Sequence, residues 1–206
     1  RSLNLVRGVR PVMTMLGTDA PTVVALCGSR RDASKTKVVL RAALSAARDR
    51  GADTRLVDLD AYDLPAFDAD ATDAGDATTL RDVVGSADAV VLGTPNYHGS
   101  YSGVLKNALD YLGRDEFAGQ TVGLVEVAGG RFPGSALAHL RTVARTLNAW
   151  TLPVEVAVPS SHSTVRAGEI VDDDVAGRVA ALGRDVVDYA RVDDHPQYRA
   201  ASTTGD

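Results

Sequence analysis

Residues 90–112 read VVLGTPNYHGSYSGVLKNALDYL, and three patterns follow one another within them. An apolar run ends in a Gly-Thr-Pro sequence, and Pro95 ends strand pairing because it has no N–H group. Residues 96–102 are mostly small or polar. Apolar residues then return at helical spacing, at Val104, Leu105, Ala108, Leu109 and Leu112. This stretch therefore predicts a buried strand, a polar loop and an amphipathic helix.

The same alternation of strand and helix recurs along the chain. Strand-like runs cover residues 22–27, 54–60, 88–94, 120–130 and 151–159, and helical patterns cover 33–51, 77–87, 103–112, 135–150 and 172–190. Residues 61–76 contain a proline and many aspartates and predict a loop. We therefore expect an α/β, flavodoxin-like three-layer sandwich whose five-stranded parallel sheet has the order 2-1-3-4-5.

Length and composition limit the classes of protein. The chain of 206 residues is 45% hydrophobic, carries a net charge of −5 and contains one cysteine. We expect one domain over residues 21–192, a disordered extension over residues 1–20 and a tail over residues 193–206. The negative charge argues against nucleic-acid binding, and no apolar run is long enough to span a bilayer. The single cysteine excludes an internal disulfide and fits a reducing compartment, so we expect a cytoplasmic protein.

Aspartate and arginine predominate among the charged residues. The chain has 23 Asp against 4 Glu, and 19 Arg against 3 Lys. A surface rich in aspartate and poor in lysine is expected where high salt screens the repulsion between charges. High genomic GC content would produce part of the same bias. A halophilic origin is therefore our expectation, with the compositional explanation left open.

The loop after the first strand, CGSRRDASKTK (27–37), combines hydroxyls, basic side chains and the start of a helix. The free N–H groups at a helix N-terminus favour a phosphate. The loop contains no Walker A sequence, and Gly28 is the one glycine in it, so a dinucleotide held in the Rossmann manner is disfavoured. The loop fits the phosphate of a mononucleotide, or else a solvated turn with Ser34 as the helix N-cap.

Two motifs resemble one known family. GSRRDASKT (28–36) is similar to the G-S-x-R-x-x-S loop of the NAD(P)H-dependent FMN reductases, a group that includes quinone, azo and chromate reductases. GTPNYHGSYSGVLKNALDYL (93–112) resembles their longer motif, P-x-Y-N-G-S-x-P-G-x-L-K-N-x-I-D. The resemblance covers roughly residues 22–190. This chain departs from the motif at His98, where Asn is common, and at Tyr101-Ser102, which replaces x-Pro.

The resemblance implies an FMN-dependent oxidoreductase with NAD(P)H as co-substrate. Hydride would pass to flavin N5 and then to a small-molecule acceptor, such as free flavin, a quinone, an azo compound or a metal oxyanion. No catalytic side chain is expected, because the cofactor carries the chemistry, and no metal is expected. The implied cofactor-binding residues are Ser29, Arg31, Ser34, Lys35 and Thr36 in the first loop, Pro95, Asn96, Tyr97, His98, Gly99 and Ser100 in the second, and Ala128, Gly129 and Gly130 in the third.

In the second loop, we expect the backbone N–H groups of residues 96–100 to pair with the polar edge of the ring, and Tyr97 to contact the ring. Lys106 and Asn107 fit the motif and are interpreted as supporting the geometry of the loop. Glu126 is unusual in an apolar strand and either pairs with an arginine or lies near solvent. Residues 160–162, SSH, border the pocket or form a simple polar loop, and the simple loop is our preferred interpretation.

Two other functions remain as alternatives. A flavodoxin would carry electrons on FMN without turnover of its own, but the T-x-T-G-x-T phosphate loop of flavodoxins is missing. A receiver-type signalling module would need an acidic pair after the first strand, where this chain has Cys27 and Gly28. Members of the resembling family form homodimers or homotetramers, so we expect a homo-oligomer.

Overall fold

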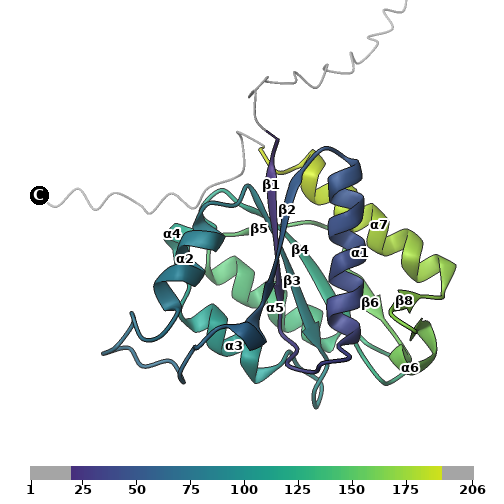
Figure 1. Cartoon of the computed structure of the whole chain (residues 1–206), viewed down its shortest axis with the longest axis horizontal. Helices are drawn as coiled ribbons and strands as arrows, with labels where there is room; N and C mark the ends of the chain where they lie inside the picture. The colour runs from purple at the N-terminus through teal and green to yellow at the C-terminus, as the bar shows by residue number, and fades with distance from the viewer. Residues whose placement is uncertain (1–19, 192–206) are drawn as a thin grey trace, which may run out of the picture.

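A parallel β-sheet runs through the centre of the computed structural model, which describes residues 20–191 (Figure 1). Its strands are β1 (Thr22–Cys27), β2 (Asp53–Asp58), β3 (Ala89–Pro95), β4 (Thr121–Val127), β5 (Trp150–Thr151) and β6 (Val156–Val158). They lie in the order β2-β1-β3-β4-β5, with β6 also paired to β4, and the pairs are parallel. The predicted flavodoxin-like order is confirmed.

The last predicted strand is divided in two, which corrects the expectation of one continuous strand over residues 151–159. Strands β5 and β6 both pair with β4. The Leu152 N–H still donates to the Val122 carbonyl of β4 at 2.9 Å, but residues 153–155 leave the ladder. Pro153 cannot donate a ladder hydrogen bond, so it interrupts the pairing. Arg141 crosses the gap and donates to the Leu152 carbonyl at 3.1 Å and to Glu155 Oε2 at 2.6 Å.

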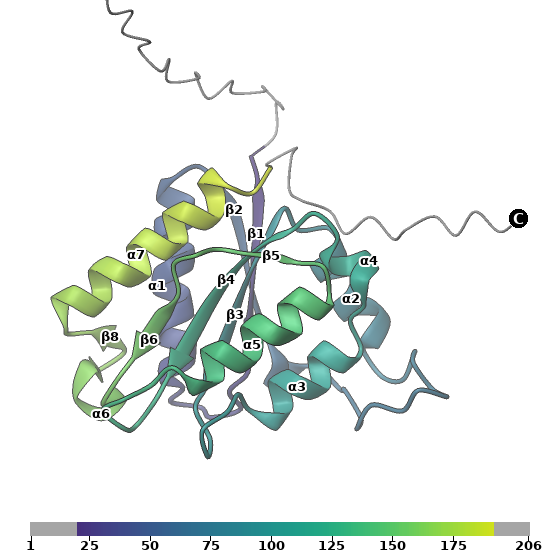
Figure 2. The same cartoon turned by 180° about the vertical axis from the view of Figure 1, so that it is seen from behind.

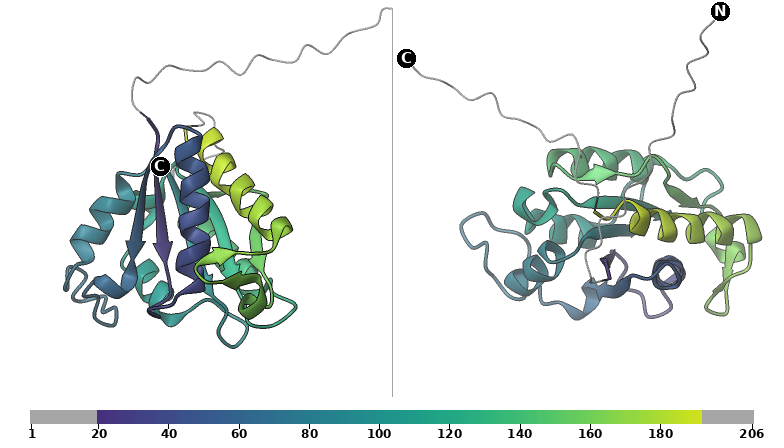
Figure 3. Two further views of the ribbon diagram at one scale, coloured as in Figure 1. Left: turned by 45° about the vertical axis from the view of Figure 1, so that its right-hand side comes forward. Right: turned by 90° about the horizontal axis from the view of Figure 1, so that it is seen from above.

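Helices cover both faces of the sheet (Figures 1 and 2). Helices α1 (Lys35–Asp49) and α7 (Asp173–Asp188) cover one face, and α2 (Ala77–Gly85), α3 (Gly103–Asp110) and α5 (Ser135–Thr146) cover the other. The residues of β1 alternate between two separate cores. Val23, Ala25 and Cys27 pack towards α1 and α7, whereas Val24 and Leu26 pack towards α2, α3 and α5. The three layers are seen edge-on in Figure 3.

Side-chain caps determine where three of these helices begin. The Ser34 hydroxyl accepts a hydrogen bond from the Lys37 N–H at 3.1 Å, at the start of α1. The Ser102 hydroxyl accepts from the Leu105 N–H at 3.1 Å in α3, and Asp172 Oδ1 accepts from the Val175 N–H at 2.9 Å in α7. Each cap is worth about 1 kcal/mol. The carboxylates that begin α7 also suit the helix dipole there.

Several short elements lie outside the sequence predictions. They are the 3₁₀ turn η1 (Leu59–Ala61), the helices α4 (Arg114–Phe117) and α6 (Ser161–Thr164), and the hairpin of β7 (Val165–Arg166) and β8 (Glu169–Ile170). None is long enough to show a periodic pattern in the sequence. In α4, the Glu116 carboxylate accepts from the Gly113 N–H at 2.6 Å.

The aspartate-rich segment 62–76 has no helix or strand, as predicted, and it is held against α3. The Asn107 side chain donates to the Pro65 carbonyl at 2.8 Å and accepts from the Phe67 N–H at 2.9 Å. Tyr111 donates to the same Pro65 carbonyl at 3.1 Å. Asn107 therefore holds this segment rather than the loop before α3, which corrects the role that the motif suggested.

The expected N-terminal extension, residues 1–20, lies outside the described residues except for Ala20. The expected tail, residues 193–206, lies wholly outside them. Among residues 20–191, none of the helices has the length and apolar character needed to cross a bilayer.

Candidate cofactor site

The loops that follow β1, β3, β4 and β6 meet at the carboxyl edge of the sheet, which is the lower edge in Figure 1. Ligands of open parallel sheets bind at this edge, where neighbouring crossovers diverge. A cavity of about 220 Å³ opens there, and we call it the edge cavity. It is lined by Ser29, Arg31, Ala33, Lys35, Thr36, Pro95, Asn96, Tyr97, Val127, Gly129, Ser161 and His162.

The edge cavity brings together part of the predicted site. Eight predicted residues line it, namely Ser29, Arg31, Lys35, Thr36, Pro95, Asn96, Tyr97 and Gly129. The other six predicted residues are absent from its lining: Ser34, His98, Gly99, Ser100, Ala128 and Gly130. Sequence reasoning missed four lining residues, of which Ala33 and Val127 are adjacent to predicted positions and Ser161 and His162 come from a different loop.

Two buried residues with hydroxyl side chains line the edge cavity beside the start of α1. Ser29 is 3% exposed and Thr36 is 2% exposed, and within residues 20–191 the structure records no hydrogen bond for either hydroxyl. The first turn of α1 contains no acidic residue, and the first N–H groups of a helix have no carbonyl within the helix to accept them. Because these hydroxyls and the first N–H groups of the helix are donors without an acceptor in the described residues, this corner of the cavity is suited to an oxygen-rich anion.

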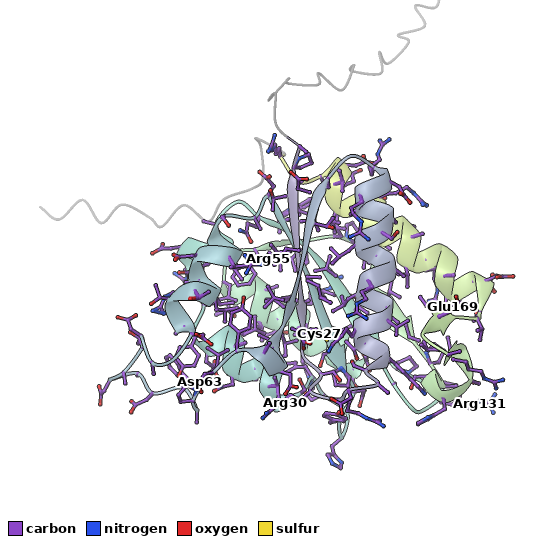
Figure 4. The ribbon with its side chains drawn as sticks, in the orientation of Figure 1. Cys27, Arg30, Arg55, Asp63, Arg131 and Glu169 are labelled. Carbon is purple, nitrogen blue, oxygen red and sulfur yellow. The ribbon has the colours of Figure 1, made fainter. Side chains whose placement is uncertain are left out.

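The basic residues of this loop divide into paired and unpaired side chains. Arg30, labelled in Figure 4, donates from Nε to Asp60 at 2.7 Å, and Lys37 pairs with Asp58 at 2.5 Å. Arg31 is exposed at the cavity, and the described part of the chain provides no acidic partner for it. The pKa of Lys35 is lowered by partial burial and by the neighbouring positive charge of Arg31. Arg31 and Lys35 are thus the two cations at the cavity that have no acidic partner among the described residues.

Gly28 is required by close packing rather than by a left-handed turn. A Cβ at this position would lie 2.8 Å from the Leu105 Cβ and 2.9 Å from the Ser102 hydroxyl. That hydroxyl donates to the Gly28 carbonyl at 2.6 Å, and the Gly28 N–H donates to the Gly93 carbonyl at 2.8 Å. The loop after β1 is therefore fastened to β3 and to the start of α3.

Residues 97–100 form a tight turn. The Tyr97 N–H donates to the Ser100 carbonyl at 2.9 Å, and the Ser100 N–H donates back to the Tyr97 carbonyl at 3.1 Å. His98 and Gly99 both have positive φ angles, +54° and +81°, as in a type I′ turn. Glycine tolerates this conformation without steric cost, whereas side-chain-bearing residues adopt it less readily.

The expectation that all N–H groups of residues 96–100 face a ligand is corrected by this turn. The Asn96 N–H donates to the Val127 carbonyl at 2.9 Å, and the Gly99 N–H donates to Asn96 Oδ1 at 3.0 Å. With the pair inside the turn, four of the five groups have acceptors within the protein. His98 is the one for which the described residues supply none. Tyr97, 48% exposed at the cavity rim, stays available for a flat ring.

Glu126 neither pairs with an arginine nor lies near solvent, so both sequence interpretations are wrong. Its side chain is fully buried at the end of β4. Oε1 accepts from Asn96 Nδ2 at 2.5 Å, and Oε2 accepts from the N–H groups of Gly134 at 2.9 Å and Leu137 at 3.2 Å. The carboxylate thus connects the loop after β3 with the N-terminus of α5.

Ser161 and His162 line the edge cavity, which corrects the preferred interpretation of residues 160–162 as a simple polar loop. The Ser160 N–H donates to the Gly130 carbonyl at 2.8 Å, and the Ser161 N–H donates to the Ala128 carbonyl at 2.9 Å. A Cβ placed on Gly129 would lie 3.9 Å from His162 Nε2. The sequence signal for this contact was the position of the segment directly after the last strand, at the same edge as the other loops.

Among residues 20–191, His, Cys, Asp and Glu side chains form no cluster of three or more suited to a metal ion. Cys27, labelled in Figure 4 above the loop after β1, is buried in the core. The profile of a known family, NADPH-dependent FMN reductase, matches residues 21–163. The chain belongs to the NADPH-dependent FMN reductase family.

Known relatives agree with this family assignment. An FMN-dependent NADPH-azoreductase of Staphylococcus aureus is 46% identical over 82 residues, which is 40% of this chain and 44% of that protein. The chain thus matches less than half the length of this curated relative. Among solved structures, FerB from Paracoccus denitrificans, a flavoenzyme NAD(P)H:(acceptor) oxidoreductase, superimposes with a TM-score of 0.71 at 24% identity, over 83% of this chain and 97% of that one.

A second solved structure is the apo form of the NADH:FMN oxidoreductase EMOB. It has a TM-score of 0.66 at 24% identity, over 82% of this chain and 89% of that chain. At these identities the structural likeness establishes the fold. Membership of the FMN reductase family rests on the profile match.

Proposed function

We propose that this chain is an FMN-containing oxidoreductase that takes a hydride from NADH or NADPH and passes electrons to a small-molecule acceptor. The acceptor classes are those of the family: free flavin, quinones, azo compounds or metal oxyanions. The observation that carries the proposal is the pair of hydroxyl residues, Ser29 and Thr36, that line the cavity beside the N-terminus of α1 and whose hydroxyls have no hydrogen-bond partner among residues 20–191. Such a corner suits an acceptor-rich ligand, and the phosphate of FMN would be one.

The residues present fit one phosphate. Ser29 and Thr36 offer O–H donors, the start of α1 offers N–H groups, and Arg31 and Lys35 offer positive charge. Ser34 supports this corner indirectly, because its hydroxyl is already engaged as the cap of α1. The loop contains one glycine, Gly28, and no glycine-rich turn that could hold a pyrophosphate, which favours FMN over FAD.

The remaining cavity residues fit a flat ring. Tyr97 offers an aromatic surface at the rim, Gly129 leaves space, and the His98 N–H is free to donate. FMN, when bound, would supply the hydride chemistry, so no side-chain acid is required for the core step. The role of the protein is to bind the cofactor, to orient it and to leave one face open to the substrates.

We further propose a homodimer or homotetramer in which a second copy completes the site. The edge cavity, at about 220 Å³, is smaller than the roughly 300–1,000 Å³ of ordinary ligand pockets. Part of the ring would therefore lie beyond the cavity, beside the half-exposed Tyr97. Phe132, on the loop after β4, is 94% exposed and offers apolar surface to a partner. A cytoplasmic location and tolerance of high salt stay predictions.

The test is to purify the protein, release its bound cofactor and identify it by mass. We expect FMN. Release of FAD or of a nicotinamide dinucleotide would contradict the assignment of the phosphate corner. Steady-state oxidation of NADH and NADPH with each acceptor class then separates an enzyme from an electron carrier. A protein that binds FMN but oxidises neither nucleotide would be a flavodoxin-type carrier.

A further inference from the structure

We propose that Glu126 is a positioning residue that fixes the amide orientation of Asn96 and, through it, the turn of residues 97–100 at the cofactor site. Glu126 itself does not line the edge cavity. Asn96 does line it, and its side chain lies between Glu126 and the turn. The part of this inference that concerns FMN rests on the proposed function. The part that concerns the turn rests on the protein alone.

The orientation of the Asn96 amide follows from the donors that surround it. A carboxylate only accepts hydrogen bonds, so Glu126 Oε1 requires the NH₂ group of Asn96, at 2.5 Å. The Asn96 NH₂ group also faces the Ser135 hydroxyl, at 3.3 Å. With both N–H groups directed this way, the Asn96 oxygen must point to the Gly99 N–H, which it accepts at 3.0 Å. The negative charge at position 126 therefore determines which end of the amide faces the turn.

The same carboxylate holds the loop after β4. Oε2 accepts from the N–H groups of Gly134 and Leu137, at 2.9 and 3.2 Å. These groups begin α5, whose N-cap residue is a glycine without a capping side chain. A negative charge is favourable at a helix N-terminus. One buried side chain thus holds two of the loops at the cavity, those after β3 and β4. A substitution at Glu126 should therefore alter the geometry of both loops.

Glu126 Oε1 accepts from Asn96, whereas Oε2 accepts from the start of α5. The contact with Asn96 can therefore be tested by exchanging the carboxylate and the amide between positions 126 and 96. In Glu126→Gln, the amide oxygen can still accept from Gly134 and Leu137, which leaves the new NH₂ group facing the Asn96 NH₂ group. Asn96 relieves this conflict by rotating its amide, which removes the acceptor of the Gly99 N–H. In Asn96→Asp alone, two carboxylates face each other at hydrogen-bond distance, which is strongly unfavourable.

The double variant Glu126→Gln/Asn96→Asp restores every bond, with the polarity reversed between positions 96 and 126 and at Ser135, and with the backbone N–H groups still donating. The new amide at position 126 would donate from its NH₂ group to one oxygen of the new carboxylate at position 96, and the Gly99 N–H would donate to the other oxygen. The Ser135 hydroxyl, a donor as well as an acceptor, would turn to donate. Glu116→Gln is the matched control, since Glu116 also accepts a backbone N–H at a helix start but lies at α4, outside the cavity lining.

The first measurement is amide hydrogen exchange of Gly99 in the apoprotein, with thermal unfolding recorded in parallel. We expect exchange about tenfold faster in Glu126→Gln than in the parent, and parental exchange in the double variant and in Glu116→Gln. The second measurement is FMN affinity, which we expect to fall roughly tenfold in Glu126→Gln. If Glu126 acts by positioning Asn96, its substitution changes the exchange rate of the Gly99 N–H, although Gly99 does not contact residue 126.

The outcomes separate this inference from the proposed function. Unchanged Gly99 exchange in Glu126→Gln, or a double variant no better than the single variants, would overturn the positioning role. If the single variants do not fold, recovery of folding in the double variant supports the swap, and failure of the double variant overturns it. A parent that binds no FMN would contradict the proposed function, while the exchange data would still decide the role of Glu126.

Discussion

Lys35 and His162 lie in contact across the edge cavity, with Lys35 Nζ 3.0 Å from His162 Nδ1, although 127 positions separate them in the chain. The ammonium group only donates, so Nδ1 accepts and the proton of a neutral ring is on Nε2. The contact joins the start of α1 to the short helix α6, which follows β6. It therefore brings residues that are distant in the chain together at the same edge of the sheet.

The Lys35–His162 pair is expected to act as a unit in cofactor binding. His162→Ala and Lys35→Met should each weaken FMN binding by about 1–2 kcal/mol, because each leaves the other side chain without its partner at the cavity. The double variant should lose less than the sum of the single losses, as coupled neighbours do. Titration calorimetry measures the cycle, and Lys106→Met, on α3, is the control for loss of a lysine. Strictly additive losses would show that the contact is incidental.

Arg31 is expected to bind the phosphate and Arg30 is not. Arg31→Ala should weaken FMN binding by about 1–3 kcal/mol, the usual value of a charge-assisted hydrogen bond. Arg30→Ala should change it little, since Arg30 is already paired with Asp60. Riboflavin, which lacks the phosphate, should bind both variants as it binds the parent. Equal losses for riboflavin and FMN in Arg31→Ala would place the arginine at the ring instead of the phosphate.

Gly99→Val tests whether the turn of residues 97–100 is part of the cofactor site. With φ at +81°, valine is strained there, at a cost of about 1–3 kcal/mol, and its Cβ would lie 3.9 Å from the Ser135 hydroxyl, which the Asn96 amide also contacts. Gly119→Val is the matched control, because Gly119 also has a positive φ, +76°, and open space, but lies at the opposite edge of the sheet. Both variants should lose similar stability in thermal unfolding. Gly99→Val alone should lose FMN affinity, and parental affinity would mean that the turn is only a connector.

The buried thiol of Cys27 predicts a dependence of stability on alkaline pH. Burial raises the pKa of this thiol above its ordinary value. The folded chain therefore keeps the proton longer than the unfolded chain. The stability that this provides is fully present below the ordinary thiol pKa and is lost as the pH rises through the raised value. Urea unfolding across this range should show a decline that Cys27→Ala reduces, and an identical decline in both proteins would contradict the assignment.

The sheet order was accessible from the sequence, because alternating strands and helices with right-handed crossovers allow few arrangements. The glycine and hydroxyl pattern of residues 28–36 likewise pointed to a loop at the sheet edge, and Ser29 and Thr36 do line the cavity there. Phosphate binding by this loop stays a prediction. The sequence shows a proline at position 153, but it does not show that the strand is interrupted there, since β5 and β6 both continue along β4.

The rest of the site depends on contacts between distant segments. Nothing near Glu126 in the sequence shows that it accepts from Asn96 and from the start of α5. In the same way, the proximity of His162 to Lys35 arises only when β6 pairs beside β4. The closed turn of residues 97–100 required the positive φ of His98, a residue that rarely adopts that conformation.

The proposed function is tested most directly by anaerobic titration of the purified, flavin-loaded protein with NADPH and, separately, with NADH. We expect at least one of the two nucleotides to bleach the visible absorbance of the bound flavin stoichiometrically. Addition of a quinone or an azo compound should then restore the absorbance, with one nucleotide oxidised for each flavin reduced. A flavin that stays oxidised in excess NADPH and in excess NADH would contradict the proposal of an NAD(P)H-dependent oxidoreductase.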